Sequence, residues 1–159
     1  MNRRSLLTLL ALAPFAALAQ EPDITKAQPD LPKEKLIITT RDGVHHDFNV
    51  EMAITSDQQT VGLMFRKSVP PDGGMLFDWG SPRASQMWMR NTLAPLDMVF
   101  INADGTIRSI AENTVPESLA VIDSHGPVRA TLELAAGTAA RLNIRVGDKV
   151  QQRIFGNAG

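Results

Sequence analysis

The chain is a mildly acidic sequence of 159 residues, with 16 lysine and arginine residues against 17 aspartate and glutamate residues. It contains no basic run, so nucleic acid is not an expected partner. Cysteine is absent, which excludes disulfides, thiolate metal sites and cysteine nucleophiles. A chain of this length without disulfides is expected to form one domain that depends on its hydrophobic core.

The first 19 residues have the pattern of a secretory signal peptide. Arg3-Arg4 precedes an apolar stretch over residues 6–18, and Ala17-Leu18-Ala19 ends it as a cleavage site. The stretch is too short to span a bilayer and contains Pro14. We therefore expect a periplasmic or secreted protein that leaves the membrane after cleavage, exported by the Sec route in preference to the twin-arginine route. Cleavage removes two basic residues, which leaves 14 against 17 and a net charge of −3.

The remaining chain divides into a short leader and one domain. Residues 20–34 contain three prolines among polar residues, which predicts a flexible leader. Over residues 35–156, short apolar runs alternate with glycine-containing turns such as Asp42-Gly43 and Asp104-Gly105. Turns at this spacing predict a mainly β domain, either a compact sandwich or a distorted barrel, with one or two short helices.

The first two strands are expected to form a hairpin with one buried face. A three-residue loop over 41–43, with Gly43 in the left-handed conformation, puts Leu36 and Ile38 opposite Val50 and Phe48. A two-residue turn would put them on the polar side instead. The buried face of the second strand is predicted to carry every second residue from position 44, namely Val44, His46, Phe48, Val50 and Met52.

Two short helices and a half-buried strand follow from local patterns. Thr55 or Ser56, with Gln58 or Gln59 three residues later, forms a capping box at the start of a helix between positions 53 and 66. A second helix is predicted over 138–142. The run 128–134 alternates, which predicts a strand with Arg129, Thr131 and Glu133 on its outward face.

The strand predicted over 96–101 carries a carboxylate between two apolar faces. Asp97 therefore needs partners, and Arg66, Arg90, the Asn91 amide or nearby backbone N–H groups are the candidates. One interpretation is a structural polar clasp that holds the preceding connection. The other is a cleft in which Arg66, Asn91 and Asp97 bind a small polar ligand.

Methionine and histidine residues suggest two other chemistries. Met87 and Met89 share one face of a strand, opposite Trp88, and with His46 their thioethers would suit Cu(I). Methionine also fills irregular cores, and these positions are expected to be buried in any case. A hydrolase using Asp97 with a nearby histidine is the second alternative, although no motif or spacing identifies a catalytic residue. No motif for a cofactor is present.

Several ordered blocks resemble the DUF192 family, also called UPF0127, over roughly residues 36–154. The blocks are Gly62-Leu63-Met64-Phe65-Arg66, Gly74-Met75-Leu76-Phe77, and Trp88-Met89-Arg90-Asn91-Thr92 continued by Pro95-Leu96-Asp97-Met98. The resemblance implies a compact, predominantly β domain, often exported in bacteria, and assigns no catalytic residues.

The sequence therefore predicts an exported binding module rather than an enzyme. Its candidate ligand-binding residues are Arg66, Asn91 and Asp97, with no catalytic residue, metal ligand or cofactor assigned. The expected partner is a small polar ligand or a protein surface.

Overall fold

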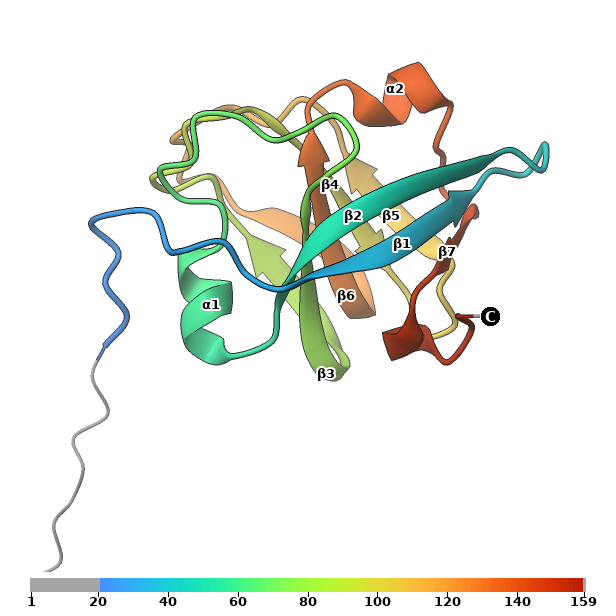
Figure 1. Cartoon of the computed structure of the whole chain (residues 1–159), viewed down its shortest axis with the longest axis horizontal. Helices are drawn as coiled ribbons and strands as arrows, with labels where there is room; N and C mark the ends of the chain where they lie inside the picture. Colours follow the sequence, from blue (N-terminus) through green and yellow to red (C-terminus); the bar gives the residue numbers. More distant parts are fainter. Residues whose placement is uncertain (1–20, 159) are drawn as a thin grey trace, which may run out of the picture.

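The computed structural model describes residues 21–158, so the predicted signal peptide lies outside the described residues. Within this range one seven-stranded sheet has the order β5-β4-β6-β3-β2-β1-β7 (Figure 1). Its strands are β1 (Lys33–Thr39), β2 (His45–Ala53), β3 (Met75–Met87), β4 (Leu96–Ile101), β5 (Ile107–Ala111), β6 (Ile122–Ala135) and β7 (Lys149–Gln151). The helices are α1 (Ser56–Val61), α2 (Thr138–Leu142) and the 3₁₀ turn η1 (Arg153–Phe155). The predicted mainly β fold with two short helices is confirmed.

The sheet curls into a nearly closed barrel. Its edge strands meet where Thr106 forms an isolated bridge with Lys149. Backbone bonds on either side hold this seam, because Ile107 N–H donates to the Asp148 carbonyl at 2.9 Å and Val150 N–H donates to the Gly105 carbonyl at 2.8 Å. The seam covers strand edges that would otherwise be open to other chains. None of the helices in residues 21–158 has the length and hydropathy needed to cross a membrane.

The β1–β2 hairpin has the predicted three-residue loop. Gly43 adopts a φ of 82°, and its N–H donates to the Thr40 carbonyl at 2.8 Å. Leu36 and Ile38 are buried, as predicted, but they lie opposite Phe48 and His46. The partners predicted on β2 were thus wrong by two residues. The hydrogen bond between Thr40 and Val44 closes the loop and sets which residues of β1 and β2 face each other. The predicted burial of Val44 was also wrong, since it is 47% exposed beside the loop.

Both helices begin where the sequence placed them. The Thr55 hydroxyl accepts from Gln58 N–H, and the Gln58 side chain accepts from Thr55 N–H, which completes the predicted capping box. Gly137 precedes α2 with a φ of 82°, a conformation that a residue without Cβ adopts at no steric cost.

The buried apolar side chains form two clusters on the two faces of the sheet. The barrel interior holds one cluster, which includes Val99 and Ile101 of β4. The second lies on the outer face of β3 and β4 and includes Met98 and Phe100. Successive residues of β4 therefore point into different clusters, and all six are buried. This confirms that β4 is buried on both faces.

β3 is long and bends over the outer cluster. Asp78 pairs with Ala130 and Arg83 pairs with Val128, so residues 79–82 face a single residue of β6. A bulge of this kind turns the strand and increases its twist, and it accommodates Pro82, which could not donate a ladder hydrogen bond. The bend carries the second half of β3 past the outward face of β6.

The predicted leader contacts the domain at several points from Ile24 onward. The Gln28 amide donates to the Gln58 and Gly62 carbonyls at 3.0 and 2.9 Å, and Met52 N–H donates to the Pro32 carbonyl at 3.0 Å. β1 begins at Lys33, two residues before the predicted domain boundary. The mobility of residues 20–34 and the cleavage after Ala19 stay predictions.

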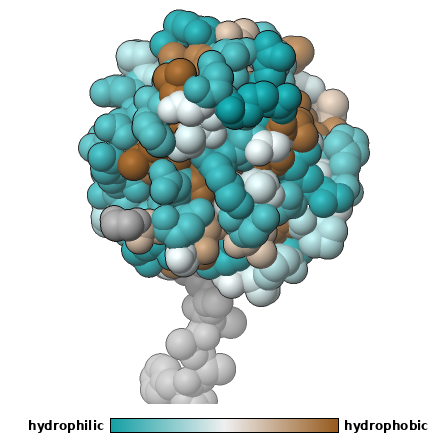
Figure 2. All heavy atoms as spheres, turned by 90° about the vertical axis from the view of Figure 1, so that its right-hand side faces the viewer, coloured by the Kyte–Doolittle hydropathy of each residue, from teal (hydrophilic) through white to brown (hydrophobic). Residues whose placement is uncertain are grey.

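The surface opposite α1 is mainly hydrophilic. Figure 2 shows this face, on the right of Figure 1, with small separate apolar patches among polar residues. A hollow lined by aromatic side chains lies beside α1 and β3.

Candidate ligand-binding site

Asp97, the predicted centre of the site, is bonded entirely to backbone. Its Oδ1 accepts from Asn113 N–H at 2.9 Å and from Gly137 N–H at 3.2 Å, and its Oδ2 accepts from Ala139 N–H at 2.9 Å. The side chain has no exposed surface. Three N–H groups satisfy the buried carboxylate and fix the start of α2 and the turn after β5 to β4. Asp97 is a structural clasp, although it does not hold the connection that the sequence suggested.

Arg66 and Asn91 lie elsewhere and tie down the segment before β1. Arg66 donates to Asp30 at 2.7 Å and to the buried Glu51 carboxylate at 3.1 Å, beside a hollow of about 280 Å³. The Asn91 amide donates to the Ile24 carbonyl at 3.2 Å. The structure does not gather Arg66, Asn91 and Asp97 into one cleft, so a cleft built on all three loses its basis. Ligand binding by Arg66 or Asn91 stays a prediction.

The residues of the two alternative chemistries are also separated. Met89 is completely buried, and its sulfur accepts a hydrogen bond from the Thr114 hydroxyl at 3.2 Å. Met87 and His46 line different hollows. No described histidine forms a hydrogen bond with Asp97, because the partners of its carboxylate are all backbone groups. Copper binding by these methionines and hydrolysis by an Asp97–histidine pair therefore have no assembled site within residues 21–158.

A different carboxyl group is buried and has no hydrogen-bond partner among the described residues. Glu133 was predicted on the outward face of β6, but only 4% of its surface is exposed. Its cross-strand neighbours are Met75 on β3 and Met98 on β4, both fully buried. Burial raises the pKa of the Glu133 carboxyl from 4.5 to about 8. The group is therefore mostly neutral near pH 7.

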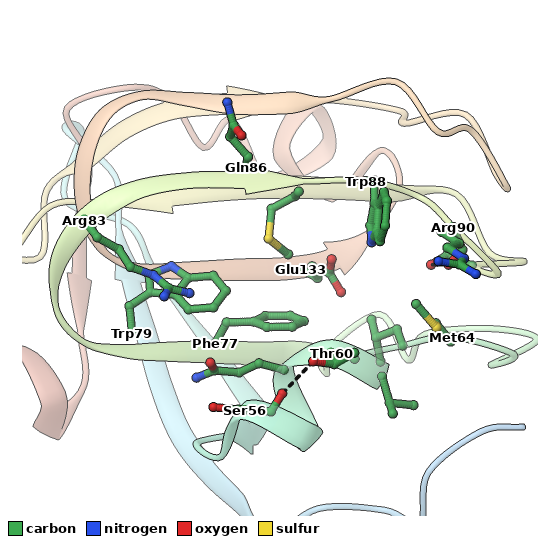
Figure 3. Close-up of a pocket in the computed structure, with 16 residues that line it drawn as sticks. Ser56, Thr60, Met64, Phe77, Trp79, Arg83, Gln86, Trp88, Arg90 and Glu133 are labelled. Carbon is green, nitrogen blue, oxygen red and sulfur yellow. Dashed lines mark hydrogen bonds between the residues drawn. The ribbon is translucent and has the colours of Figure 1, made fainter. Parts of the chain in front are cut away.

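Glu133 lies in a hollow of about 430 Å³, which we call the tryptophan hollow. In Figure 3 its carboxyl group lies between Trp79 and Trp88. The hollow extends between the second half of β3, α1 and the turn after β3. Its other lining residues are Ser56, Gln59, Thr60, Val61, Gly62, Leu63, Met64, Phe77, Arg83, Gln86, Met87, Arg90 and Thr92.

Hydrogen bonds and packing fix one wall of the tryptophan hollow. The Trp79 indole N–H donates to the Thr131 hydroxyl at 3.2 Å, and the Thr131 and Ser85 hydroxyls are 3.3 Å apart. The Trp79 ring also packs against Phe77, with centroids 5.7 Å apart. Trp88, at the other end, is 47% exposed. One indole is thus held rigidly and the other is accessible from solvent.

A guanidinium group lies over each indole ring. Arg83 is 4.3 Å from the Trp79 ring centroid, and Arg90 is 5.5 Å from that of Trp88. The arginine ion pairs found within residues 21–158 belong to other residues, namely Arg66, Arg129 and Arg153. In the described part of the chain, Arg83 and Arg90 therefore have no carboxylate partner.

A glycine allows β3 to approach β6 beside Glu133. Gly74 has a φ of 148°, and a Cβ at this position would collide with the Glu133 backbone carbonyl. The Gly74-Met75-Leu76-Phe77 block of the sequence thus supports the floor of the tryptophan hollow.

Sequence reasoning missed Glu133, Trp79 and Arg83. The alternation of β6 gives the correct face for Glu133, but nothing local shows that β3 and α1 cover that face. The one available sign was composition, because Trp79 and Trp88 are the only tryptophans of the chain.

The family match to this chain covers most of the residues that form the barrel. The model of the DUF192 family, described as "Uncharacterized ACR", matches residues 37–152. A crystal structure from Sinorhizobium meliloti 1021, described as a candidate transcription regulator, is 48% identical, with a TM-score of 0.78 over 80% of this chain and 99% of that chain. A protein of unknown function from Novosphingobium aromaticivorans DSM 12444 is 37% identical, with a TM-score of 0.74 over 86% of this chain and 94% of that chain. No curated protein matches.

Proposed function

The chain belongs to the DUF192 family, which has no assigned activity, and we propose from its own geometry that it binds a small molecule in the tryptophan hollow. The observation that carries this proposal is the Glu133 carboxyl group, which faces the hollow and makes no hydrogen bond with another described residue. In this proposal the ligand binds away from Arg66, Asn91 and Asp97.

A structural role does not account for Glu133. Burial disfavours the ionised form of this carboxyl group, whereas a methionine at this position would pack against Met75 and Met98 without that cost. Ligand sites characteristically combine a concave, aromatic surface with a few polar groups whose pKa values are shifted. The tryptophan hollow has both properties.

Binding is favoured over hydrolysis by the number of carboxyl groups. A carboxylic acid with a raised pKa can act as a general acid, but most glycoside hydrolases need a second carboxylate across the scissile bond. Among residues 21–158, Glu133 is the only acidic residue that lines the tryptophan hollow.

The description of the Sinorhizobium protein as a candidate transcription regulator is not carried over to this chain. DNA-binding domains concentrate basic residues on one face, and this chain has a net charge of −1.

We also infer that the protein works outside the cytoplasm, as a periplasmic or secreted protein released by cleavage after Ala19. The support is the pattern of residues 1–19. Expression of the full chain in a bacterial host, followed by fractionation and N-terminal sequencing, tests this. A mature protein that begins at Gln20 in the periplasm or medium is expected, whereas cytoplasmic protein that retains Met1 would contradict it.

Intrinsic fluorescence tests the binding proposal directly, because both tryptophans of the chain line the tryptophan hollow. Metabolites, sugars and organic acids would be screened by tryptophan emission and by thermal shift, since a ligand that binds only the folded state raises its melting temperature. A binder should change both signals in the wild type and in Glu112→Met, which alters an exposed glutamate. In Glu133→Met the same compound should lose at least tenfold in affinity while the protein stays folded. Binding that is unchanged in Glu133→Met would refute this site.

A further inference from the structure

The tryptophan hollow is positively charged, although the chain as a whole is slightly acidic. Its ionisable lining residues are Arg83, Arg90 and Glu133. Burial keeps the Glu133 carboxyl mostly neutral near pH 7, since its pKa is raised to about 8. The two guanidinium groups then leave about two positive charges, without a carboxylate partner in residues 21–158. A concave site lined by one sign of charge concentrates ligands of the opposite sign.

The arginines are arranged to recognise an anion. Each guanidinium lies over the face of an indole ring, an attractive contact that restricts its motion, and a guanidinium carries its N–H donors in its own plane. A guanidinium can hold a carboxylate or phosphate group through two parallel hydrogen bonds. Because each guanidinium already lies over a ring before a ligand binds, the arginine side chain loses less conformational entropy when it binds an anion.

The state of Glu133 agrees with an anionic ligand. An ionised carboxylate on the floor of the hollow would repel an anion, whereas the protonated group donates one hydrogen bond to an acceptor oxygen. A carboxylic acid kept neutral by apolar surroundings can serve as such a donor. Here the surroundings are Met75 and Met98 on the two flanking strands.

The walls are suited to a ring. The indole of Trp79 and the exposed indole of Trp88 lie on opposite sides of Glu133 in Figure 3. Flat π surfaces stack on aromatic rings or on the C–H face of a sugar. Gln59, Thr60 and Gln86 add polar groups along the sides of the tryptophan hollow.

We propose that the tryptophan hollow selects a small anion carried on a ring, with its carboxylate or phosphate on Arg83 or Arg90, its ring against an indole, and an acceptor oxygen on Glu133. This inference rests on the proposed binding function. It adds the chemical class of the ligand and the role of each charged group.

A cationic ligand fits less well, because it would approach two guanidinium groups that already occupy indole faces. An uncharged sugar could use the walls but would leave both arginines unpaired. These two classes provide the comparisons for the experiment.

The test uses two matched series, each with a neutral, a cationic and an anionic compound that share one ring. One is glucose, glucosamine and glucose 6-phosphate, and the other is benzamide, benzylamine and benzoate. Affinities of the full mature protein are measured at pH 6.5 by tryptophan emission and calorimetry. In at least one series the anion should bind at least tenfold more tightly than its neutral and cationic counterparts. Equal affinity across both series, or preference for a cation, would overturn the inference.

Single-charge variants identify the groups responsible. Arg83→Gln or Arg90→Gln should weaken binding of the preferred anion at least fivefold and leave binding of the neutral member unchanged. Arg141→Gln removes the same charge from an exposed position outside the tryptophan hollow and should have no such effect. Far-ultraviolet circular dichroism confirms that each variant is folded. If neither hollow variant changes anion affinity, the assignment of the arginines is wrong.

The pH profile tests the role of Glu133. Anion affinity should fall as the pH rises through about 8, because the ionised carboxyl group repels the ligand, and this fall should disappear in Glu133→Gln. A profile that is the same in wild type and variant would refute the donor role. The two proposals fail differently: if only uncharged compounds bind at the hollow, the binding function stands and the anion inference falls, whereas a Glu133-independent site removes both.

Discussion

Replacement of Glu133 by glutamine should stabilise the protein increasingly as the pH rises. Glutamine has nearly the same shape as glutamate but does not ionise. The Glu133 pKa is 4.5 in the unfolded chain and about 8 in the folded protein, so the folded state holds the proton more tightly. The contribution of this group to the free energy of unfolding is therefore complete below pH 4.5. It is lost progressively as the pH rises to about 8.

The magnitude follows from the pKa difference. Each pH unit within this window corresponds to 1.36 kcal/mol. The wild type should thus lose about 3 kcal/mol relative to Glu133→Gln between pH 4.5 and 7, and about 5 kcal/mol by pH 8 and above. Other titrating groups contribute equally to both proteins and cancel in the difference.

Urea denaturation at intervals from pH 4 to 9 measures this difference. Because only its change with pH is compared, the constant effect of the amide group drops out. Glu112→Gln, the same chemical change on an exposed side chain, provides the baseline. If the difference between Glu133→Gln and the wild type does not grow between pH 4.5 and 8, the Glu133 carboxyl is solvated in the folded protein and its pKa is not raised.

Three other substitutions test the supports of the barrel and the hollow, each by urea denaturation. Asp97→Asn places an amide donor against backbone N–H groups such as Ala139 and should destabilise by about 3 kcal/mol; a loss under 1 kcal/mol would contradict the clasp. Gly74→Ala should destabilise by about 3 kcal/mol or more through the collision with the Glu133 carbonyl, and wild-type stability would refute the close approach. Arg66→Met removes the cation from a buried carboxylate and should destabilise by about 2 kcal/mol; no loss would mean that the pair contributes nothing to stability.

The elements predicted correctly are those specified by neighbouring residues. The capping box at Thr55 and Gln58 depends on a spacing of three residues. The hairpin loop that contains the left-handed Gly43 is closed by hydrogen bonds within five residues, 40–44. Such interactions involve only residues that are close in the sequence, so they can be recognised without knowledge of the fold. The two-sided burial of β4 followed from the same local logic, because both of its alternating faces are apolar.

The three predicted site residues do not lie together, because their grouping required contacts between distant segments. Burial of Asp97 was expected, and backbone N–H groups were among its candidate partners. The particular N–H groups belong to residues 113, 137 and 139, which the barrel brings to β4. Arg66 and Asn91 were expected to face the same cleft, but they bind residues before β1 instead.

The sequence by itself determined the class of fold, the faces of the strands and the positions of the helices, because alternation, capping and turn chemistry act over a few residues. The tertiary structure alone decided that Glu133 is buried. Its neighbours Met75 and Met98 are more than thirty residues away in the chain, and the bulge at residues 79–82 bends β3 past the face that alternation assigned to solvent. A carboxyl group that would be ionised on an open sheet therefore becomes a mostly neutral acid between two tryptophans.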